Sequence, residues 1–206
     1  MSDQLYISSS CKIDDSHVFK DGDLLLGKKI AVAEWLLMIY KHFRFDYPKF
    51  YKMDNLSKLG WLATEFLLQD VSLKSYEPED IGIVFYNRSS SLDTDIKYFD
   101  TVKAIASPAL FVYTLPNIVM GEISIRHHLK GENILFVSDR FESGLMRQYV
   151  QDLFTSGSVR CCICGWIEFF ENTVETALYL VETKNNGMFL PFTEENINKL
   201  YQLTNG

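Results

Sequence analysis

The segment that decides the fold reads Ala106-Ser107-Pro108-Ala109-Leu110-Phe111-Val112-Tyr113-Thr114-Leu115-Pro116-Asn117. Its two prolines interrupt regular structure, because proline has no backbone N–H to donate within a helix. Before this segment, residues 92–105 follow Ser91 and predict a helix. After it, residues 117–129 predict another helix, which ends at Lys130-Gly131. Pro108 therefore interrupts the first helix region, and Pro116 starts or breaks another segment.

Apolar runs outside this region predict the strands. The five expected strands are residues 5–13, 81–86, 134–137, 159–169 and 174–182. The short runs 81–86 and 134–137 are continuously apolar, which is typical of strands buried on both faces. Turns are expected at Asp21-Gly22-Asp23 and at Glu171-Asn172-Thr173.

Helical spacing of apolar residues predicts the remaining elements. Besides 92–105 and 117–129, the expected helices are 31–43, 55–68, 141–154 and 193–203. Asn55 and Thr193 are the expected N-caps of two of them. Strands and helices alternate and the pattern finishes on a strand pair. This order predicts a layered α/β fold with a largely parallel sheet and right-handed crossovers.

Size and composition are those of a globular protein. The chain has 206 residues, of which 47% are apolar and 23% charged. It shows neither a repeat nor a linker, so we expect one domain over residues 1–206. The net charge of -7, without a basic cluster, argues against nucleic-acid binding. The same charge disfavours docking to an acidic carrier protein, unless Arg126, Lys130 and Arg147 cluster in space.

The sequence also predicts a cellular compartment. The N-terminal residues show no basic segment followed by an apolar one, so they do not form a secretory signal. No apolar run approaches the roughly 20 residues of a membrane span. Four cysteines without an export signal indicate free thiols in a reducing environment. We therefore expect a cytoplasmic protein.

Several motifs occur in one order over about half the chain. They are Met53–Leu59, Pro78–Val84, Ser89–Asp95, Ala106–Asn117, Gly121–Ile125 and Lys130–Asn133. In this order and spacing they resemble the N-terminal motifs of β-ketoacyl synthases (3-oxoacyl-acyl-carrier-protein synthases), including "MDRLSRL", "sPalFp.tlpN" and "lrGPn". The resemblance implies a single thiolase-like half with the order βαβαβαββ. Such a half has a mixed, mostly parallel five-stranded sheet with helices on both faces. A complete synthase of this family has two halves, with its active site between them.

The resemblance also shows which catalytic residues are missing. The family's cysteine motif, "dtACSSSL", falls on Ser138–Leu145, and Thr155-Ser156-Gly157 matches the family's following "rsG". The cysteine position therefore falls on Arg140 or Phe141, and neither side chain can form a thioester. The family also uses two histidines from its second half. Here all histidines precede this turn: His17, His42, His127 and His128. We therefore expect no catalytic residues, and no condensing enzyme.

Cysteines and histidines could also point to a metal site. Cys161-Cys162-Ile163-Cys164 has a CxxC spacing, but in a strand Cys161 and Cys164 would face opposite sides. Adjacent His127 and His128 on a helix point about 100° apart and do not converge on one ion. We favour buried structural thiols and a solvated helix end, and expect no metal and no cofactor.

Other side chains are open to two interpretations. Ser138 and Ser143 are weak candidates for a serine nucleophile, because the first glycine of a GxSxG elbow is absent. Gly165-Trp166 stands where the family has a glycine pair, so the tryptophan would crowd a space that the family keeps open. One aromatic stretch fits core packing and an interface or acyl-binding surface equally well: Trp35, Phe43, Phe45, Tyr47, Phe50 and Tyr51.

The leading hypothesis is a non-condensing relative of β-ketoacyl synthases, similar to a chain-length-factor subunit. It would serve a fatty-acid, polyketide or aryl-polyene-type pathway by pairing with a complete synthase. The resemblance implies an interface on the strand before the turn and the helix after it. The residues are Ile134, Leu135, Phe136, Val137, Leu145, Met146, Tyr149 and Val150.

Other partners and activities remain open at this stage. The same surface could form a homodimer, and an acyl carrier protein is a further candidate partner. A second hypothesis is a serine-dependent acyltransferase or thioesterase that uses Ser138 or Ser143, with His127 or His128 as its base. A third is an acyl-chain binding module without a partner protein.

Overall fold

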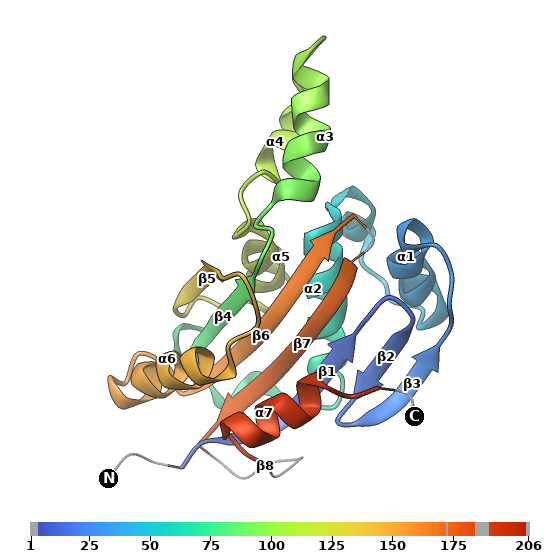
Figure 1. Cartoon of the computed structure of the whole chain (residues 1–206). Coiled ribbons are helices and arrows are strands. Elements are labelled where there is room, and N and C mark those ends of the chain that lie inside the picture. Colours follow the sequence, from blue (N-terminus) through green and yellow to red (C-terminus); the bar gives the residue numbers. More distant parts are fainter. Residues whose placement is uncertain (1–3, 172, 184–189, 205–206) are drawn as a thin grey trace.

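The computed structural model describes residues 4–171, 173–183 and 190–204 (Figure 1). Its centre is one twisted sheet. The strands are β1 (Tyr6–Ile13), β2 (His17–Lys20), β3 (Asp23–Gly27), β4 (Ile81–Asn87), β5 (Asn133–Val137), β6 (Cys161–Phe170), β7 (Thr173–Glu182) and β8 (Leu190–Pro191). They lie in the order β3-β2-β1-β7-β6-β4-β5, and β8 pairs with β1. All five expected strands are present. The expectation of a five-stranded sheet is wrong, because the described residues form an 8-stranded sheet.

Strand directions confirm a mixed sheet. β4 runs parallel to both β5 and β6. β7 is antiparallel to β6 and to β1, so β1, β4, β5 and β6 share one direction and β7 opposes them. The strands that were not predicted, β2, β3 and β8, add only antiparallel pairings. The parallel pairings among the described strands therefore lie at the β4–β5 end of the sheet.

The β2–β3 hairpin accounts for two of the three additional strands. Its turn is Asp21-Gly22, and both residues have positive φ angles, 52° and 94°. This conformation suits a two-residue hairpin turn, for which Asp-Gly is a favoured sequence. The Asp21 carboxylate also accepts a hydrogen bond from the backbone N–H of Ser10 on β1, at 2.7 Å. The turn was predicted, but the two strands were not, because they are too short to show alternating apolar and polar residues.

Helices cover both faces of the sheet, as predicted. The α-helices are α1 (Val32–His42), α2 (Asn55–Leu67), α3 (Leu92–Val102), α4 (Pro108–Val112), α5 (Ile118–His127), α6 (Ser143–Thr155) and α7 (Glu194–Tyr201). Three short 3-10 helices are η1 (Pro48–Lys52), η2 (Leu73–Ser75) and η3 (Pro78–Asp80). α1, α2 and α5 pack on one face, and α6 and α7 pack on the other. In the described part of the chain no helix is both long and apolar enough to cross a membrane.

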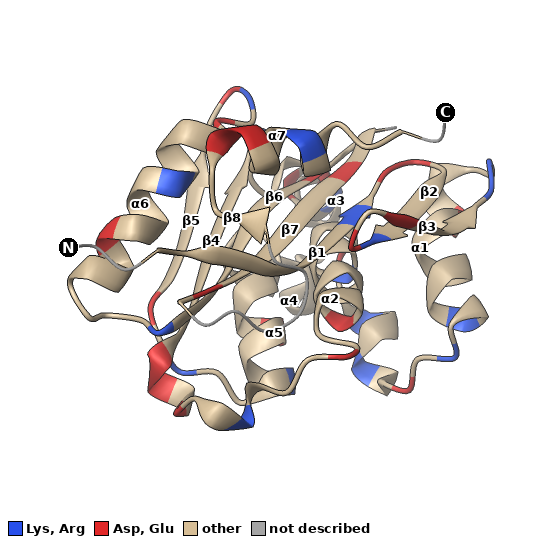
Figure 2. Cartoon of the chain, turned by 90° about the horizontal axis from the view of Figure 1, so that it is seen from below, with Lys and Arg blue, Asp and Glu red and all other residues tan. Residues whose placement is uncertain are grey.

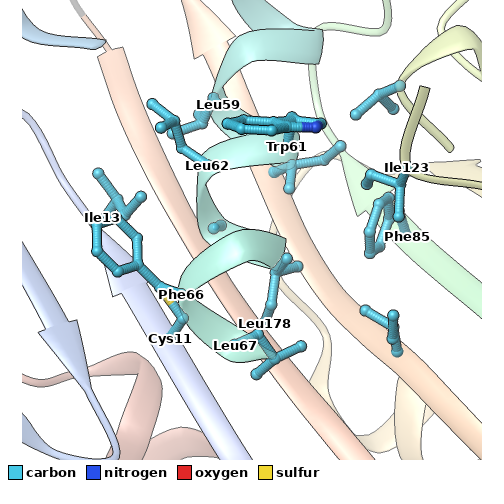
Figure 3. Close-up of a cluster of buried hydrophobic side chains, with 14 of the residues drawn as sticks. Cys11, Ile13, Leu59, Trp61, Leu62, Phe66, Leu67, Phe85, Ile123 and Leu178 are labelled. Atoms are coloured by element: carbon cyan, nitrogen blue, oxygen red, sulfur yellow. The ribbon is translucent and has the colours of Figure 1, made fainter. Parts of the chain in front are cut away.

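Helix α2 lies at the centre of the larger core. Leu59, Trp61, Leu62 and Phe66 are fully buried on different sides of it, between the sheet, α1 and α5 (Figure 3). At Gly60 a Cβ atom would lie 2.5 Å from Val119 of α5, so only glycine permits this close helix contact.

The ends of two helices test the predicted N-caps. The cap of α2 is Asp54, whose carboxylate accepts the N–H of Ser57 at 3.0 Å, so the expectation of Asn55 is wrong. Asn55 lies in the first helical turn instead, where its amide reaches the next helix. Thr193 caps α7, as predicted.

The aromatic stretch from Trp35 to Tyr51 packs in the core rather than forming an exposed surface. Trp35 and Phe50 are fully buried, and Tyr47 stacks on Trp61 with ring centroids 5.3 Å apart. Of this stretch only Tyr51 exposes more than half of its surface. The second face of the sheet is covered by α6 and α7 rather than by these rings.

Candidate functional site

The turn after β5 has the predicted strand-to-helix geometry. The backbone N–H of Ser138 donates to the carbonyl of Asn87 at 2.8 Å, which extends the β4–β5 pairing by one residue. The Ser138 hydroxyl donates to the carbonyl of Arg140 at 3.0 Å within the turn. Helix α6 then begins at Ser143, after Glu142. A side chain in this turn would lie just before a helix N-terminus, where a thiolate is stabilised.

The two residues at the expected cysteine position have other contacts. Arg140 extends into solvent and forms an ion pair with Glu142. Phe141 stacks on Tyr201 of α7, with ring centroids 4.2 Å apart and planes 24° apart. It also meets Trp166 of β6 edge to face, at 6.2 Å. We call Phe141, Trp166 and Tyr201 the aromatic cluster. It fills the space behind the turn with packed rings.

The serine alternative lacks an assembled base. His127 and His128 line a cavity of about 610 Å³ together with Pro78 and Ile81, at the N-terminal end of β4. The Ser138–Ser143 turn follows the C-terminal end of β5, which is parallel to β4. His127 and the turn therefore lie at opposite ends of these strands, and His127 instead pairs with Glu65 at 2.9 Å.

The predicted interface lies at an edge of the sheet. Among the described strands β5 pairs with β4 only, so none of them covers its other edge. The expectation that β5 is buried on both faces is wrong. Ile134, Leu135 and Phe136 are half-buried, and Val137 is 59% exposed. An apolar run of this length fits an edge strand as well as a central one, and only the topology distinguishes them.

Helix α6 divides the remaining predicted interface residues. Leu145 is 58% exposed and Tyr149 is half-buried, so both face outward. Met146 and Val150 are fully buried against the sheet within the core of the chain, so their placement in an interface is wrong. The outward pair, Leu145 and Tyr149, points about 100° away from the buried pair, Met146 and Val150, around the helix axis. The sequence alone does not determine which of these two directions faces the sheet.

A small apolar cavity lies between β5 and α6. Its volume is about 300 Å³, and its lining includes Tyr86, Phe136, Leu145 and Tyr149. Phe136 stacks on Tyr86 at 4.9 Å and meets Tyr149 edge to face at 5.0 Å. Burial raises the pKa of both Tyr86 and Tyr149, so their hydroxyl groups remain neutral. This cavity can take an uncharged side chain.

A second exposed apolar surface lies on α3 and α4. In Figure 1 these helices project from the end of the sheet at which β4 ends. We call residues 92–115 the arm. Its exposed large apolar residues are Leu92, Ile96, Phe99, Val102, Ile105, Phe111, Val112 and Leu115. The sequence shows helical spacing of apolar residues here, but it does not show that the rest of the chain leaves them uncovered.

The cysteines are structural thiols, as predicted. All four are free and buried. Cys161 faces the core beneath α2, whereas Cys162 and Cys164 face the core beneath α6 and α7. A hydrogen bond to Cys164 and burial raise the pKa of Cys162, and burial raises that of Cys161. The described residues contain no group of three or more His, Cys, Asp or Glu side chains able to hold a metal.

The basic residues do not form a patch. Arg126 pairs with Glu65 at 3.3 Å, Lys130 with Glu79 at 3.3 Å and Arg147 with Glu194 at 3.6 Å. Figure 2 shows lysines and arginines scattered among acidic residues. Each of the three basic groups that could have attracted an acidic protein is therefore offset by its own carboxylate.

Comparisons with known proteins complete the description. No protein-family model and no curated protein sequence matches the chain. The chain is similar in structure to "The ishigamide ketosynthase/chain length factor", with a TM-score of 0.67, 18% identity and coverage of 91% of this chain and 64% of that chain. It is similar to a type II PKS acyl-carrier protein complex with its ketosynthase (AntDE:AntF), with a TM-score of 0.62, 13% identity and coverage of 88% and 63%.

A third similar structure is the ketosynthase ApeO in complex with its chain length factor ApeC from Xenorhabdus doucetiae. The TM-score is 0.61 and the identity 15%, with coverage of 96% of this chain and 90% of that chain. The chain thus spans less than two thirds of the matched chain in the first two structures and most of it in the third. Its fold is similar to that of these ketosynthase and chain-length-factor structures.

Proposed function

We propose that this chain is a non-condensing, chain-length-factor-like subunit that binds a complete ketosynthase in fatty-acid, polyketide or aryl-polyene-type biosynthesis. The observation that carries the proposal is the place of Phe141. Phe141 is one of the two residues, with Arg140, on which the resemblance places the cysteine of a condensing enzyme, and it is packed against Tyr201 and Trp166. The chain therefore combines a ketosynthase-like fold with a turn that is packed with aromatic side chains.

The chemistry of condensation explains why this matters. The acyl group must be held as a thioester on a thiolate, and a thiol becomes a thiolate at neutral pH only when its surroundings lower its pKa. The thiols of Cys11, Cys161 and Cys162 have pKa values that burial raises. These thiols stay protonated within the core, so none of them replaces the missing nucleophile.

The partner surface that we propose has two parts. The first is the open edge of β5 with the cavity beside it, lined by Phe136, Leu145 and Tyr149. An edge strand presents unpaired backbone groups on which another strand can pair. The second is the arm. Two of the similar structures are those of a ketosynthase together with a chain length factor, which supports a ketosynthase as the partner.

Other readings have less support. A homodimer would use the same β5 edge and becomes an outcome of the binding test below. An acyl carrier protein appears in one similar structure, but here Arg126, Lys130 and Arg147 are each paired with a carboxylate. The serine-dependent acyltransferase or thioesterase and the acyl-chain binding module find no support among the similar structures.

The first experiment tests the absence of condensation chemistry. The purified chain is incubated with an acyl-carrier thioester, and its intact mass is measured beside that of a complete ketosynthase. We expect an acyl adduct on the ketosynthase and an unchanged mass for this chain. A stable adduct on this chain would show that another side chain accepts the acyl group, and the non-condensing assignment would be wrong.

The second experiment tests the partner surface. Val137→Arg and Leu145→Arg place a charge on side chains that are 59% and 58% exposed. We expect each to weaken binding to the cognate ketosynthase about tenfold or more, about 1.4 kcal/mol, because the charge would be buried in an apolar contact. Leu24→Arg is the matched control, since Leu24 is 42% exposed on β3 at the opposite edge of the sheet.

Calorimetric titration of the two proteins measures these affinities. If Leu24→Arg weakens binding as much as Leu145→Arg, the β5 edge is not the site. If the unmodified chain forms only a homodimer that Val137→Arg dissociates, the surface is right and the proposed partner is wrong.

A further inference from the structure

The arm has almost no core of its own. Every residue from Asp95 to Ile118 is exposed or half-buried. One ring pair, Tyr98 and Phe111 at 5.5 Å, joins α3 to α4. Hydrophobic burial, which fixes the other helices on the sheet, therefore does little to fix the direction of the arm. Its direction must be set by contacts at its two ends, where it joins the rest of the chain, which we call the body.

The first joint is at the start of α3. Thr94 is 1% exposed, and its hydroxyl donates to Oδ2 of Asp54 at 2.9 Å. The other oxygen of Asp54 caps α2, so the same carboxylate holds the first turns of both helices. Asn55 adds a bond to Asp93 at 3.1 Å. α3 is thereby tied to the central helix of the core.

The second joint is at the end of α4. The hydroxyl of Tyr113 donates to Oε1 of Glu122 at 3.0 Å. Glu122 is 4% exposed on α5, and its other oxygen lies 2.7 Å from Nζ of Lys49. Between the two joints, the Ser91 hydroxyl donates to the carbonyl of Thr114 at 2.7 Å, which joins the two ends of the arm. Each end of the arm is thus anchored to a carboxylate, which is half-buried at Asp54 and buried at Glu122.

We propose that Thr94 and Tyr113 are positioning residues that fix the direction of the arm before a partner binds. We call the pairs Thr94–Asp54 and Tyr113–Glu122 the latch. The proposal rests on the proposed function, in which the arm contacts a ketosynthase. A rigid arm loses less conformational freedom on binding than a mobile one, so pre-organisation strengthens binding without any added contact. Neither positioning residue needs to touch the partner.

The two carboxylates, one half-buried and one buried, make the latch specific. A carboxylate removed from water needs hydrogen-bond donors. Asp54 and Glu122 obtain theirs in part from the arm, at two separate points along it. Two joints at separate ends define an orientation, whereas a single joint would permit rotation about it.

The test measures the orientation of the arm directly. Nitroxide labels are attached at Ile105→Cys, whose parent residue is 86% exposed at the tip of the arm, and at Lys130→Cys on the body. The native cysteines are all buried, so they stay unlabelled in the folded chain. Double electron–electron resonance then gives the distribution of tip-to-body distances. We expect one narrow peak.

The variants remove the hydroxyl groups while keeping the side-chain shape. Thr94→Val with Tyr113→Phe should broaden the distance distribution at least twofold. Thr94→Ser, which keeps the hydroxyl, should leave it narrow. Thermal unfolding of the same samples confirms that each variant is folded. An equally narrow distribution in the double variant would overturn the latch.

Binding to the cognate ketosynthase tests the consequence. The double variant should bind about tenfold more weakly, and Thr94→Ser should bind as the unmodified chain does. A broadened arm with unchanged affinity would overturn the positioning role. If the unmodified chain binds no ketosynthase, the proposed function fails, while the distance distributions still decide whether the latch exists.

Discussion

The turn after β5 joins a strand to a helix, and its side chains pack against other elements. Phe141 is held by rings from two other elements, Trp166 on β6 and Tyr201 on α7. A cysteine placed there would therefore stand among aromatic rings, and His127 and His128 line a cavity at the other end of β4. Changing this one residue would restore the thiol but not the groups that activate it.

Gly165, next to Trp166, provides a residue-scale prediction. A Cβ atom at this position would lie 2.0 Å from the carbonyl oxygen of Ala177 on β7, and its φ of 155° is one that side chains rarely adopt. Gly165→Ala must therefore force β6 and β7 apart. We expect a loss of about 2–3 kcal/mol in the free energy of unfolding, measured by urea denaturation.

Gly121 is the matched control for that substitution. It lies on α5 with no atom within 4 Å of its would-be Cβ. Gly121→Ala should stabilise the chain by about 0.5–1 kcal/mol, because alanine loses less backbone freedom in a helix than glycine does. Equal losses in both variants would contradict the crowding that we describe between β6 and β7.

At the scale of elements, helices α2 and α5 are joined by a charged group. Burial tends to raise the pKa of Glu65, but its hydrogen bonds to His127 and Arg126 outweigh burial, so the pKa lies below its usual 4.5. Because the folded state holds the charged form, Glu65 contributes stability above pH 4.5 that is lost as the pH falls through the lowered pKa.

This sign gives a pH-dependent prediction. Glu65→Gln should lower the free energy of unfolding by about 1–2 kcal/mol at pH 7, because a neutral amide pairs less strongly with Arg126. The difference should shrink as the pH is lowered through 4 toward 3. Urea denaturation at several pH values measures it. A difference that stays constant over this range would mean that the charge of Glu65 has no role.

The arm gives a second prediction at this scale. Ile96 and Phe99 are 50% and 65% exposed on α3, so replacing both with lysine, a good helix former, removes little packing. The free energy of unfolding should change by only about 0.5 kcal/mol. Affinity for the ketosynthase should fall about tenfold, as titration calorimetry can measure. A large fall in stability with unchanged affinity would mean that these side chains serve the fold.

At the scale of the whole molecule, one sheet carries two cores, and helix α7 closes the second. Ile197 and Leu200 of α7 are buried on the sheet, and Tyr179 of β7 donates to the carbonyl of Ile197 at 3.0 Å. Lys12 of β1 donates to the carbonyl of Tyr201 at 2.7 Å, at the end of the same helix. With both faces covered, the exposed apolar surface is concentrated on the arm, and smaller parts of it lie at the β5 edge and on β3.

This distribution predicts how the chain behaves without a partner. Large exposed apolar surfaces promote association, whereas a net charge of -7 opposes it. We expect self-association that grows with protein concentration and with salt, because salt screens the repulsion. Sedimentation velocity at low and high ionic strength measures it, with Val137→Arg as a variant that should self-associate less. Self-association that weakens with added salt would contradict an apolar contact.

The amino-acid sequence by itself determined the element types and which residues stand in the turn after β5. Apolar periodicity located the five main strands and most helices, because a strand or helix that packs on a core must repeat its apolar residues at its own spacing. The absence of cysteine from Ser138–Leu145 is a matter of residue identity and needs no structure. The cap of α2 was missed by one residue, since Asp54 and Asn55 are both good caps.

Tertiary structure alone decided which apolar residues are covered. Ile134–Val137 has the composition of a buried strand, yet β5 lies at the edge, because strand order depends on contacts between residues far apart in the chain. Met146 and Leu145 are neighbours in sequence, but one is buried and the other exposed according to how α6 sits on the sheet. The arm shows the same limit. The spacing of apolar residues in the sequence indicates that a helix has an apolar face. Only the packing of the folded chain determines whether this chain or a partner covers that face.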